Sequence, residues 1–265
     1  MPTAFHLIES VGPERDQLAS LMQAEGVAVT VSAPADIPEV PACDAAVFLA
    51  SEDPLAPSGV PSAGQVEAWA DAAARAGARF VLYSTVLLYA DGGETELMAN
   101  DPELDAAPQL QALADAELEL FGSSAEILLL RLGLILEPGG TASESLRVGL
   151  TARSLLNPEG EGRFVPLLDR ATLAHALVSV APSDLHGGWD LVASDAPLTE
   201  LLHAAATLLK VPEPEVAPLE SAIASAGTHN GLRWLVSRRV TGRDLRETGA
   251  VQPRDWNLIL KEALA

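Results

Sequence analysis

A short apolar run that ends in two hydroxyl residues limits most strongly how this chain can fold. Residues 79–83 form the run, contain no breaker, and are followed by Ser84 and Thr85. A run that is apolar on both faces is typical of a strand buried inside a parallel sheet. Ligands of open α/β sheets bind just beyond the carboxyl ends of such strands. The hydroxyl pair is therefore a candidate site, and the alternative is that it only bonds to the backbone of its own loop.

The rest of the chain alternates similar runs with helix-like segments. Residues 4–8 and 27–31 are expected to be strands on either side of a helix at 14–25, and 44–50 and 126–136 are further strands. An Ala-rich helix is expected at 62–76, with Ser62 as its N-cap and Gly77 as its stop. Only residues 33–43 join the second strand to the third, which is short for a crossover between parallel strands. We therefore expect an extended linker there.

Composition sets the class of protein. The chain has 265 residues, of which 48% are hydrophobic, enough for one large core with a small appended lobe. No apolar run is long enough to cross a membrane, and the N-terminus lacks the pattern of a signal peptide. Cys43 is the single cysteine, which fits a reducing compartment. These features predict a cytoplasmic protein.

The net charge of the chain argues against nucleic acid and anionic membranes as partners. The net charge is −21, so the surface should repel nucleic acid and anionic membranes. The partner is then a small molecule or another protein, and a homodimer remains an open alternative. Arginines concentrate in the last 33 residues, either to dock this tail on an acidic body or to form an anion pocket; they are Arg233, Arg238, Arg239, Arg243, Arg246 and Arg254. The five histidines are scattered, and we expect no metal site.

Three segments carry a resemblance to a known family. They are Ser84-Thr85 followed four residues later by Tyr89, the strand Leu-Leu-Leu-Arg-Leu-Gly-Leu-Ile-Leu with Glu-Pro-Gly-Gly at 128–140, and Arg-Phe-Val-Pro-Leu-Leu-Asp-Arg-Ala at 163–171. They resemble the extended short-chain dehydrogenase/reductase superfamily, in its NAD-dependent epimerase/dehydratase-like branch. The resemblance implies an α/β fold, a Rossmann-like doubly wound parallel sheet with a small C-terminal lobe. Residues 1–135 and 163–195 would form the Rossmann-like part, and 136–162 and 196–265 the lobe.

The same resemblance assigns candidate catalytic residues. Thr85 aligns with the active-site hydroxyl of the family and Tyr89 with its loop tyrosine. The Tyr-x-x-x-Lys pair of the family falls on Gln109 and Leu113, and the helix expected at 106–121 contains no Tyr, Lys or His. Because neither Gln109 nor Leu113 titrates, ordinary proton transfer by this pair is not expected.

The cofactor turn of the family is also altered here. Its three glycine positions fall on Glu9, Gly12 and Arg15, so Gly12 is the one vestigial cofactor-binding residue. Glu9 would lie near a bound pyrophosphate and repel it. The second strand ends in Ser32-Ala33-Pro34, which offers neither the acidic residue that binds the ribose of NAD nor the arginine that favours NADP. We therefore expect no cofactor, with NAD(P) as the alternative.

These observations predict a divergent, redox-inactive member of the superfamily. It would bind a small molecule or protein partner, or act as a scaffold or regulator. Two alternatives stay open: an NAD(P)-dependent oxidoreductase or epimerase with non-standard motifs, and a non-redox lyase or isomerase on this fold.

Overall fold

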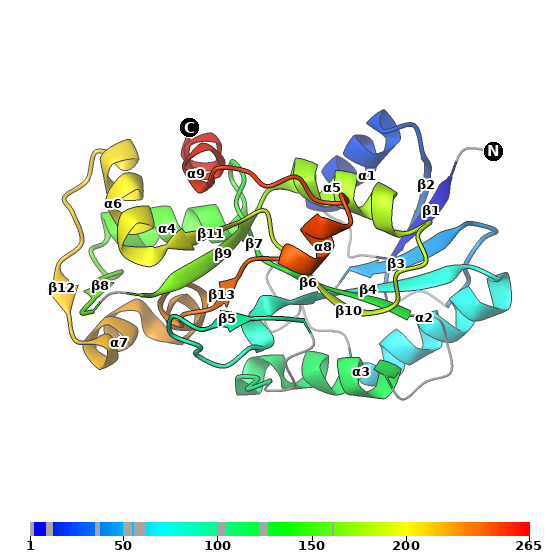
Figure 1. Cartoon of the computed structure of the whole chain (residues 1–265), viewed down its shortest axis with the longest axis horizontal. Helices are drawn as coiled ribbons and strands as arrows, with labels where there is room; N and C mark the ends of the chain where they lie inside the picture. The colour runs from blue at the N-terminus through cyan, green and yellow to red at the C-terminus, as the bar shows by residue number, and fades with distance from the viewer. Residues whose placement is uncertain are drawn as a thin grey trace.

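A six-stranded parallel sheet forms the centre of the molecule (Figure 1). The computed structural model describes residues 3–8, 13–34, 38–49, 55, 62–99, 104–121, 127–160 and 162–265. The strand order is β10-β6-β4-β3-β1-β2, and all neighbours run parallel. The bounds are β1 (Ala4–Ile8), β2 (Ala28–Ser32), β3 (Ala45–Leu49), β4 (Arg79–Thr85), β6 (Ile127–Leu132) and β10 (Gly187–Leu191). The predicted α/β class and Rossmann-like sheet are confirmed.

Helices cover both faces of this sheet. Helices α1 (Pro13–Ala24) and α5 (Arg170–Val180) lie on one face, and α2 (Ala63–Ala76) and α3 (Gln111–Phe121) lie on the other (Figure 1). The α2 helix begins where its caps predict, because the Ser62 hydroxyl accepts a hydrogen bond from the amide of Gln65. It ends at Gly77, whose φ of 70° is left-handed and favours glycine.

The extended linker is confirmed in the part of the chain that the structure describes. Between β2 and β3, residues 33, 34 and 38–44 contain neither a helix nor a strand. Trp69 of α2 fastens the linker, because its indole Nε1 donates to the carbonyl of Pro34 at 3.2 Å. Among the described strands, β2 is the terminal strand of the large sheet, and the strand order reverses between β1 and β3.

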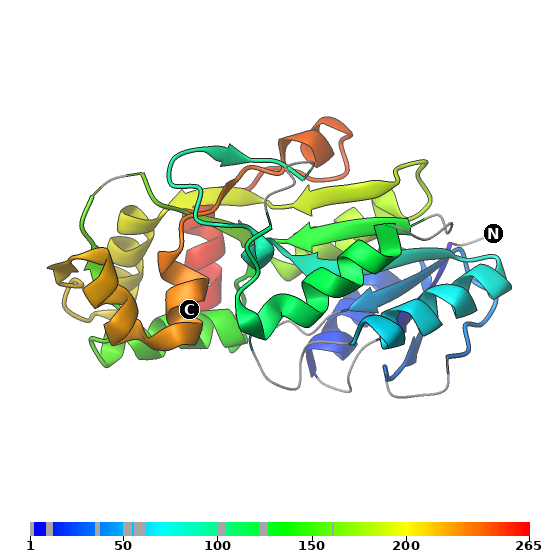
Figure 2. The same ribbon diagram turned by 90° about the horizontal axis from the view of Figure 1, so that it is seen from below.

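The chain leaves the large sheet through Gly133, at the end of β6. The amide of Gly133 donates to Leu191 in β10 at 3.0 Å. A Cβ at this position would lie 3.0 Å from the Pro166 carbonyl oxygen, so a larger residue would force the backbone of β9 to move by a few tenths of an ångström. Beyond it, β7 (Leu134–Ile135) pairs with β9 (Phe164–Leu168), which also pairs with β11 (Ser194–Pro197). Strand β6 is thus continued at once into a second, smaller sheet (Figure 2).

Residues 134–160, 162–168 and 192–265, which we call the C-terminal part, contain this second sheet and the elements around it. Two further ribbons pair β5 (Glu96–Leu97) with β13 (Arg239–Val240) and β8 (Asn157–Pro158) with β12 (Val216–Ala217). The remaining elements are α4 (Thr141–Thr151), α6 (Leu198–Leu209), α7 (Leu219–Asn230), the π-helical turn η3 (Gly231–Leu235), α8 (Arg243–Glu247) and α9 (Trp256–Leu264). No helix among the described residues is long and apolar enough to cross a membrane.

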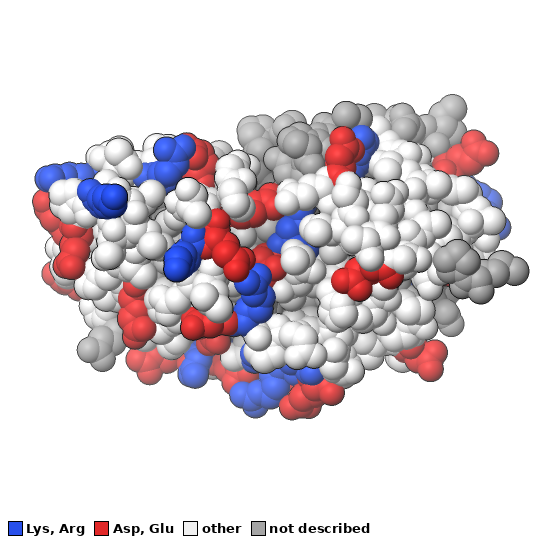
Figure 3. Space-filling view, turned by 90° about the horizontal axis from the view of Figure 1, so that it is seen from above, with Lys and Arg blue, Asp and Glu red and all other residues white. Residues whose placement is uncertain are grey.

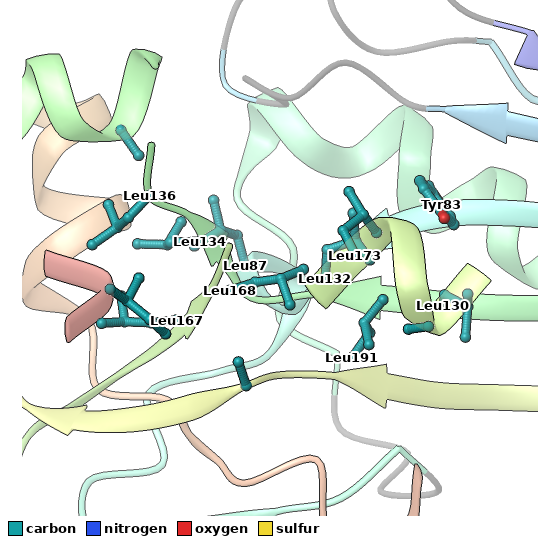
Figure 4. Close-up of a cluster of buried hydrophobic side chains, with 14 of the residues drawn as sticks. Tyr83, Leu87, Leu130, Leu132, Leu134, Leu136, Leu167, Leu168, Leu173 and Leu191 are labelled. Carbon is teal, nitrogen blue, oxygen red and sulfur yellow. The ribbon is translucent and has the colours of Figure 1, made fainter. Parts of the chain in front are cut away.

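One hydrophobic core joins the two sheets (Figure 4). Leu130 and Leu132 of β6, Leu134 of β7, and Leu167 and Leu168 of β9 all belong to the same buried cluster. Each buried leucine contributes about 1.5–3 kcal/mol by leaving water. The C-terminal part is therefore packed on the sheet by apolar burial, as well as by its polar contacts.

The basic tail docks on acidic side chains. Arg243 pairs with Glu96 at 2.7 Å, and Arg254 pairs with Asp169 at 3.0 Å and with Glu262 at 2.8 Å. Figure 3 shows basic side chains beside acidic ones on the face that it views. These pairs agree with the docking interpretation of the arginine-rich tail.

Candidate functional site

The hydroxyl pair ends β4, as the sequence predicts. Thr85 is buried, and its Oγ1 accepts a hydrogen bond from the amide of Leu87 at 3.2 Å, which begins the short turn η1 (Val86–Leu88). Among the described residues, none accepts a hydrogen bond from Thr85, so its own proton is free to donate. The Ser84 hydroxyl is also buried and has no hydrogen-bond partner there. Because successive strand residues point to opposite faces, the two hydroxyls serve different sides of the sheet.

Tyr89 lies in a buried polar cluster, and its hydroxyl is hydrogen-bonded to two side chains of that cluster. Its side chain is 1% exposed, and its hydroxyl donates to Asp190 Oδ1 at 2.9 Å and accepts from Arg131 Nη1 at 2.8 Å. Burial, reinforced by the charge of Asp190, raises the pKa of Tyr89. Tyr89 is therefore a neutral hydrogen-bonding group here.

Strand register and one helix assemble this cluster. The pairing of β10 with β6 sets Asp190 beside Arg131. Glu117 of α3 receives the guanidinium of Arg131, with Nη2 to Oε2 at 2.7 Å and Nε to Oε2 at 3.1 Å. Burial disfavours the charged arginine, but the hydrogen bonds and charge of Glu117 outweigh it and raise the pKa of Arg131. We name Tyr89, Glu117, Arg131 and Asp190 the Arg131 cluster.

The Arg131 cluster holds two carboxyl groups and one cation. Asp190 is 5% exposed, and the guanidinium of Arg131 already forms an ion pair with Glu117. Burial raises the pKa of Asp190 to about 7, although its bond to Tyr89 and the charge of Arg131 oppose the shift. Asp190 is thus the group in the cluster that gains or loses a proton near neutral pH.

The two positions that align with Tyr-x-x-x-Lys, Gln109 and Leu113, differ in their exposure to solvent. Gln109 is exposed in the turn η2 (Pro108–Leu110), which leads into α3. Leu113 is 0% exposed and belongs to the hydrophobic core. A lysine ammonium at a site so buried would pay a large desolvation cost. The surroundings of Leu113 are therefore built for an apolar side chain.

Arg238 is a residue of the site region that the sequence analysis named only among the arginines of the tail, and did not place beside Tyr89. It is 3% exposed, and its guanidinium donates to the carbonyls of Tyr89, Leu232 and Leu87, at 3.0, 2.8 and 3.2 Å. Burial lowers its pKa to about 10, which still leaves it charged at neutral pH. Arg238 thereby ties η3 of the C-terminal part to the turn that follows Thr85. Asp190, likewise missed, gives no local sequence signal, because its partner Tyr89 lies 101 positions away.

The carboxyl ends of β1 and β3, where the strand order reverses, are the second feature of interest. Gly12 and Glu9 lie outside the described residues, but α1 begins right after them, and its N-terminus carries a partial positive charge. Arg15 stands in the first turn of α1 and donates from Nε and Nη2 to Asp16 Oδ1, at 3.1 and 3.0 Å. A cation and a helix N-terminus at a strand-order reversal favour an anionic ligand. No group of side chains among the described residues is arranged to hold a metal ion.

Comparisons with known proteins identify the fold. No protein-family model matches the sequence. No curated protein matches it either. Solved structures do match: human epimerase family protein SDR39U1, solved with NADPH, is 22% identical, with a TM-score of 0.80 over 99% of both chains. The enzyme WbmH of Bordetella bronchiseptica, in complex with NAD+, is 16% identical, with a TM-score of 0.73 over 100% of this chain and 97% of its own.

A nucleoside-diphosphate-sugar epimerase from Pseudomonas aeruginosa is 15% identical, with a TM-score of 0.74 over 99% of this chain and 96% of its own. The chain has the fold of the extended short-chain dehydrogenase/reductase superfamily, and the predicted resemblance is confirmed at that level. The expectation of no cofactor is corrected, because structures of this fold are solved with NADPH or NAD+ and so point to a nicotinamide cofactor. The prediction relied on the missing glycines, whereas the helix N-terminus at the switch point also attracts phosphate. Thr85 and Tyr89 as catalytic residues stay predictions.

Proposed function

We propose that this protein binds a nicotinamide dinucleotide beyond the carboxyl ends of β1 and β3, and that it does not oxidise or reduce substrates through a Tyr/Lys pair. The observation that carries the second half is the helix that follows β4. Gln109 is exposed, Leu113 is buried in the core, and residues 108–121 contain no Tyr, Lys or His. The first half is supported by the similar structures solved with NADPH or NAD+.

The described residues fit such a nucleotide. Helix α1 follows β1 in the chain, so its N-terminus would lie near a phosphate bound beyond the carboxyl end of β1, and Arg15 could turn its guanidinium from the exposed carboxylate of Asp16 to that phosphate. At the end of β4, the buried Thr85 hydroxyl keeps a proton that it can donate. A bound nicotinamide would supply a hydride donor or acceptor. Thr85 would orient a polar group of the ligand, and Arg238 would hold the turn that carries the bond from Leu87 to Thr85.

Proton transfer is the step that this chain does not support. In the superfamily the tyrosine is the acid/base and the lysine lowers its pKa. An amide at position 109 can donate a hydrogen bond but cannot exchange a proton at neutral pH. The protein would then keep the nucleotide bound without turning it over. It would bind a small molecule or protein partner and act as a scaffold or regulator.

Calorimetric titration with NAD, NADH, NADP and NADPH tests the binding half. We expect saturable binding of at least one of the four, weakened by Arg15→Gln but unchanged by Arg147→Gln. Arg147 is the matched control, because it is an exposed arginine in the first helix of the C-terminal part and pairs with Glu144. No heat at millimolar nucleotide would overturn the binding proposal.

A turnover assay tests the other half. Reduced nucleotide is followed by its absorbance in the presence of sugar nucleotides, aldehydes and ketones. We expect no consumption of reduced nucleotide that depends on Thr85, so the wild type and Thr85→Val should give the same rate. Consumption that disappears in Thr85→Val, with the variant still folded and still binding nucleotide, would establish the alternative, an oxidoreductase or epimerase with non-standard motifs.

A further inference from the structure

The outer edge of β2 is open in the described structure. In the large sheet, β2 pairs with β1 and with no other described strand. The amide of Ala28 donates to the carbonyl of Thr3, toward β1. Since alternate residues of a strand bond to alternate sides, Thr30 and Ser32 also face β1. The N–H and C=O groups of Val29 and Val31 therefore point away from the sheet.

This edge lacks the features that usually keep edge strands apart. Natural edges carry lysines, prolines, bulges or inward-pointing charges. Residues 27–32 contain no charged residue and no proline, although the chain has a net charge of −21. Three of the five residues of β2 are exposed, and Val31 is 38% exposed. The strand is a neutral template for another strand on an otherwise acidic molecule.

The sequence of β2 is nearly the same in both directions. It reads Ala-Val-Thr-Val-Ser, with Thr30 at the centre, a valine on each side and a small residue at each end. A two-fold axis requires a surface that is complementary to itself. An antiparallel copy centred on Thr30 would place valine opposite valine and a small residue opposite a small residue. Pairs of β-branched residues across strands are favourable.

We propose that two copies of this chain associate through β2, antiparallel about a two-fold axis at Thr30, so that their large sheets become one continuous sheet. Val29 exchanges both backbone hydrogen bonds with the partner's Val31, and Val31 does so with the partner's Val29. Thr30 faces the partner's Thr30 in a pair without backbone hydrogen bonds. This inference is independent of the proposed nucleotide site.

The absence of charge on the β2 edge argues for a second copy over a charged peptide. A neutral edge offers no ion pair to a charged partner, whereas a second copy presents the same neutral edge. The rest of each copy is acidic, so the two molecules repel each other over the distance that salt screens. The dimer should therefore strengthen as ionic strength rises, the reverse of an interface held by opposite charges.

Sedimentation of the full chain over a range of concentrations and salt tests the association. We expect a dimer that tightens with salt and becomes a monomer in Val31→Lys. Leu118→Lys is the matched control, because Leu118 is the most exposed large hydrophobic residue described, at 66%, and lies on α3. A monomer at every concentration and salt would overturn the proposal, as would a dimer lost in Leu118→Lys and kept in Val31→Lys.

Cross-linking tests the register. In a Cys43→Ser background, Thr30→Cys places the two sulfur-bearing residues at a Cα separation of about 4.5 Å, within disulfide reach. Ala28→Cys places them roughly 14 Å apart, four strand residues along, where no disulfide can form. We expect oxidation to link the Thr30→Cys protein and not the Ala28→Cys protein. Linking of both, or of neither, would overturn the two-fold at Thr30.

Discussion

Replacing Asp190 with asparagine removes one of two buried carboxyl groups that share Arg131, and keeps an oxygen that accepts from Tyr89. In the folded protein burial raises the pKa of Asp190 to about 7, against 3.8 for the free group. A folded-state pKa above the unfolded value means that the folded protein holds the extra proton. The contribution to stability is therefore complete below about pH 4 and is lost as the pH rises through about 7.

The magnitude follows from this window. Between about pH 5 and pH 7 the unfolded group is ionised and the folded group is protonated. Two pH units at about 1.4 kcal/mol each give about 3 kcal/mol. The free energy of unfolding of Asp190→Asn, relative to the wild type, should therefore rise by up to about 3 kcal/mol between about pH 5 and pH 8. Other titrating groups, including His6, cancel in this difference because both proteins contain them.

Urea denaturation followed by circular dichroism at several pH values measures this difference. Asp184→Asn is the control, because Asp184 is exposed and lies a few residues before β10. Its difference from the wild type should not change with pH. If the Asp190→Asn difference is also independent of pH, Asp190 is ionised throughout, and the argument from one cation and two carboxyl groups is refuted.

Three other predictions follow from the same kind of reasoning. Burial lowers the pKa of His6, so stability should fall as the pH drops below about 6.5, and thermal melts of His6→Gln should lose that slope. Arg131→Met leaves Glu117 buried without its cation and should cost about 3–5 kcal/mol in urea denaturation, whereas Glu117→Gln together with Arg131→Met should cost less. Trp69→Phe removes the bond to Pro34 and should cost about 1 kcal/mol, with hydrogen exchange rising in the peptide around 38–44; unchanged exchange would mean that the linker is held by other contacts.

Local patterns in the sequence predict most of the sheet. The apolar runs at 4–8, 44–50 and 79–83 become β1, β3 and β4, because strands covered by helices on both faces need no polar side. The run at 126–136, expected as one strand, is divided at Gly133 into β6 and β7, which belong to different sheets. The caps of α2 at Ser62 and Gly77 are also confirmed. They could be predicted because capping depends on residues that are close in sequence. The short linker before β3 predicts a missing crossover helix, since the length of a connection is a local property.

The polar contacts of the site could not be predicted in this way. Asp190 meets Tyr89 because β10 pairs with β6 in one register, and no pattern around either residue encodes that register. Arg238 likewise depends on where η3 folds against the turn after Thr85. The alignment with the superfamily placed Gln109 and Leu113, but the exposure of one and the burial of the other needed the packed helix.

The passage through Gly133 has a consequence for how fast a ligand can enter. The same run of backbone belongs to both sheets, with the Gly133 amide held by Leu191 and the next residues paired with β9. A hinge opening at this point would break those bonds and split the shared leucine core, so large swings of the C-terminal part away from the sheet are costly. Entry and escape of a ligand should then proceed without such a swing, with association rates that are insensitive to the solvent viscosity changes that slow large domain motions.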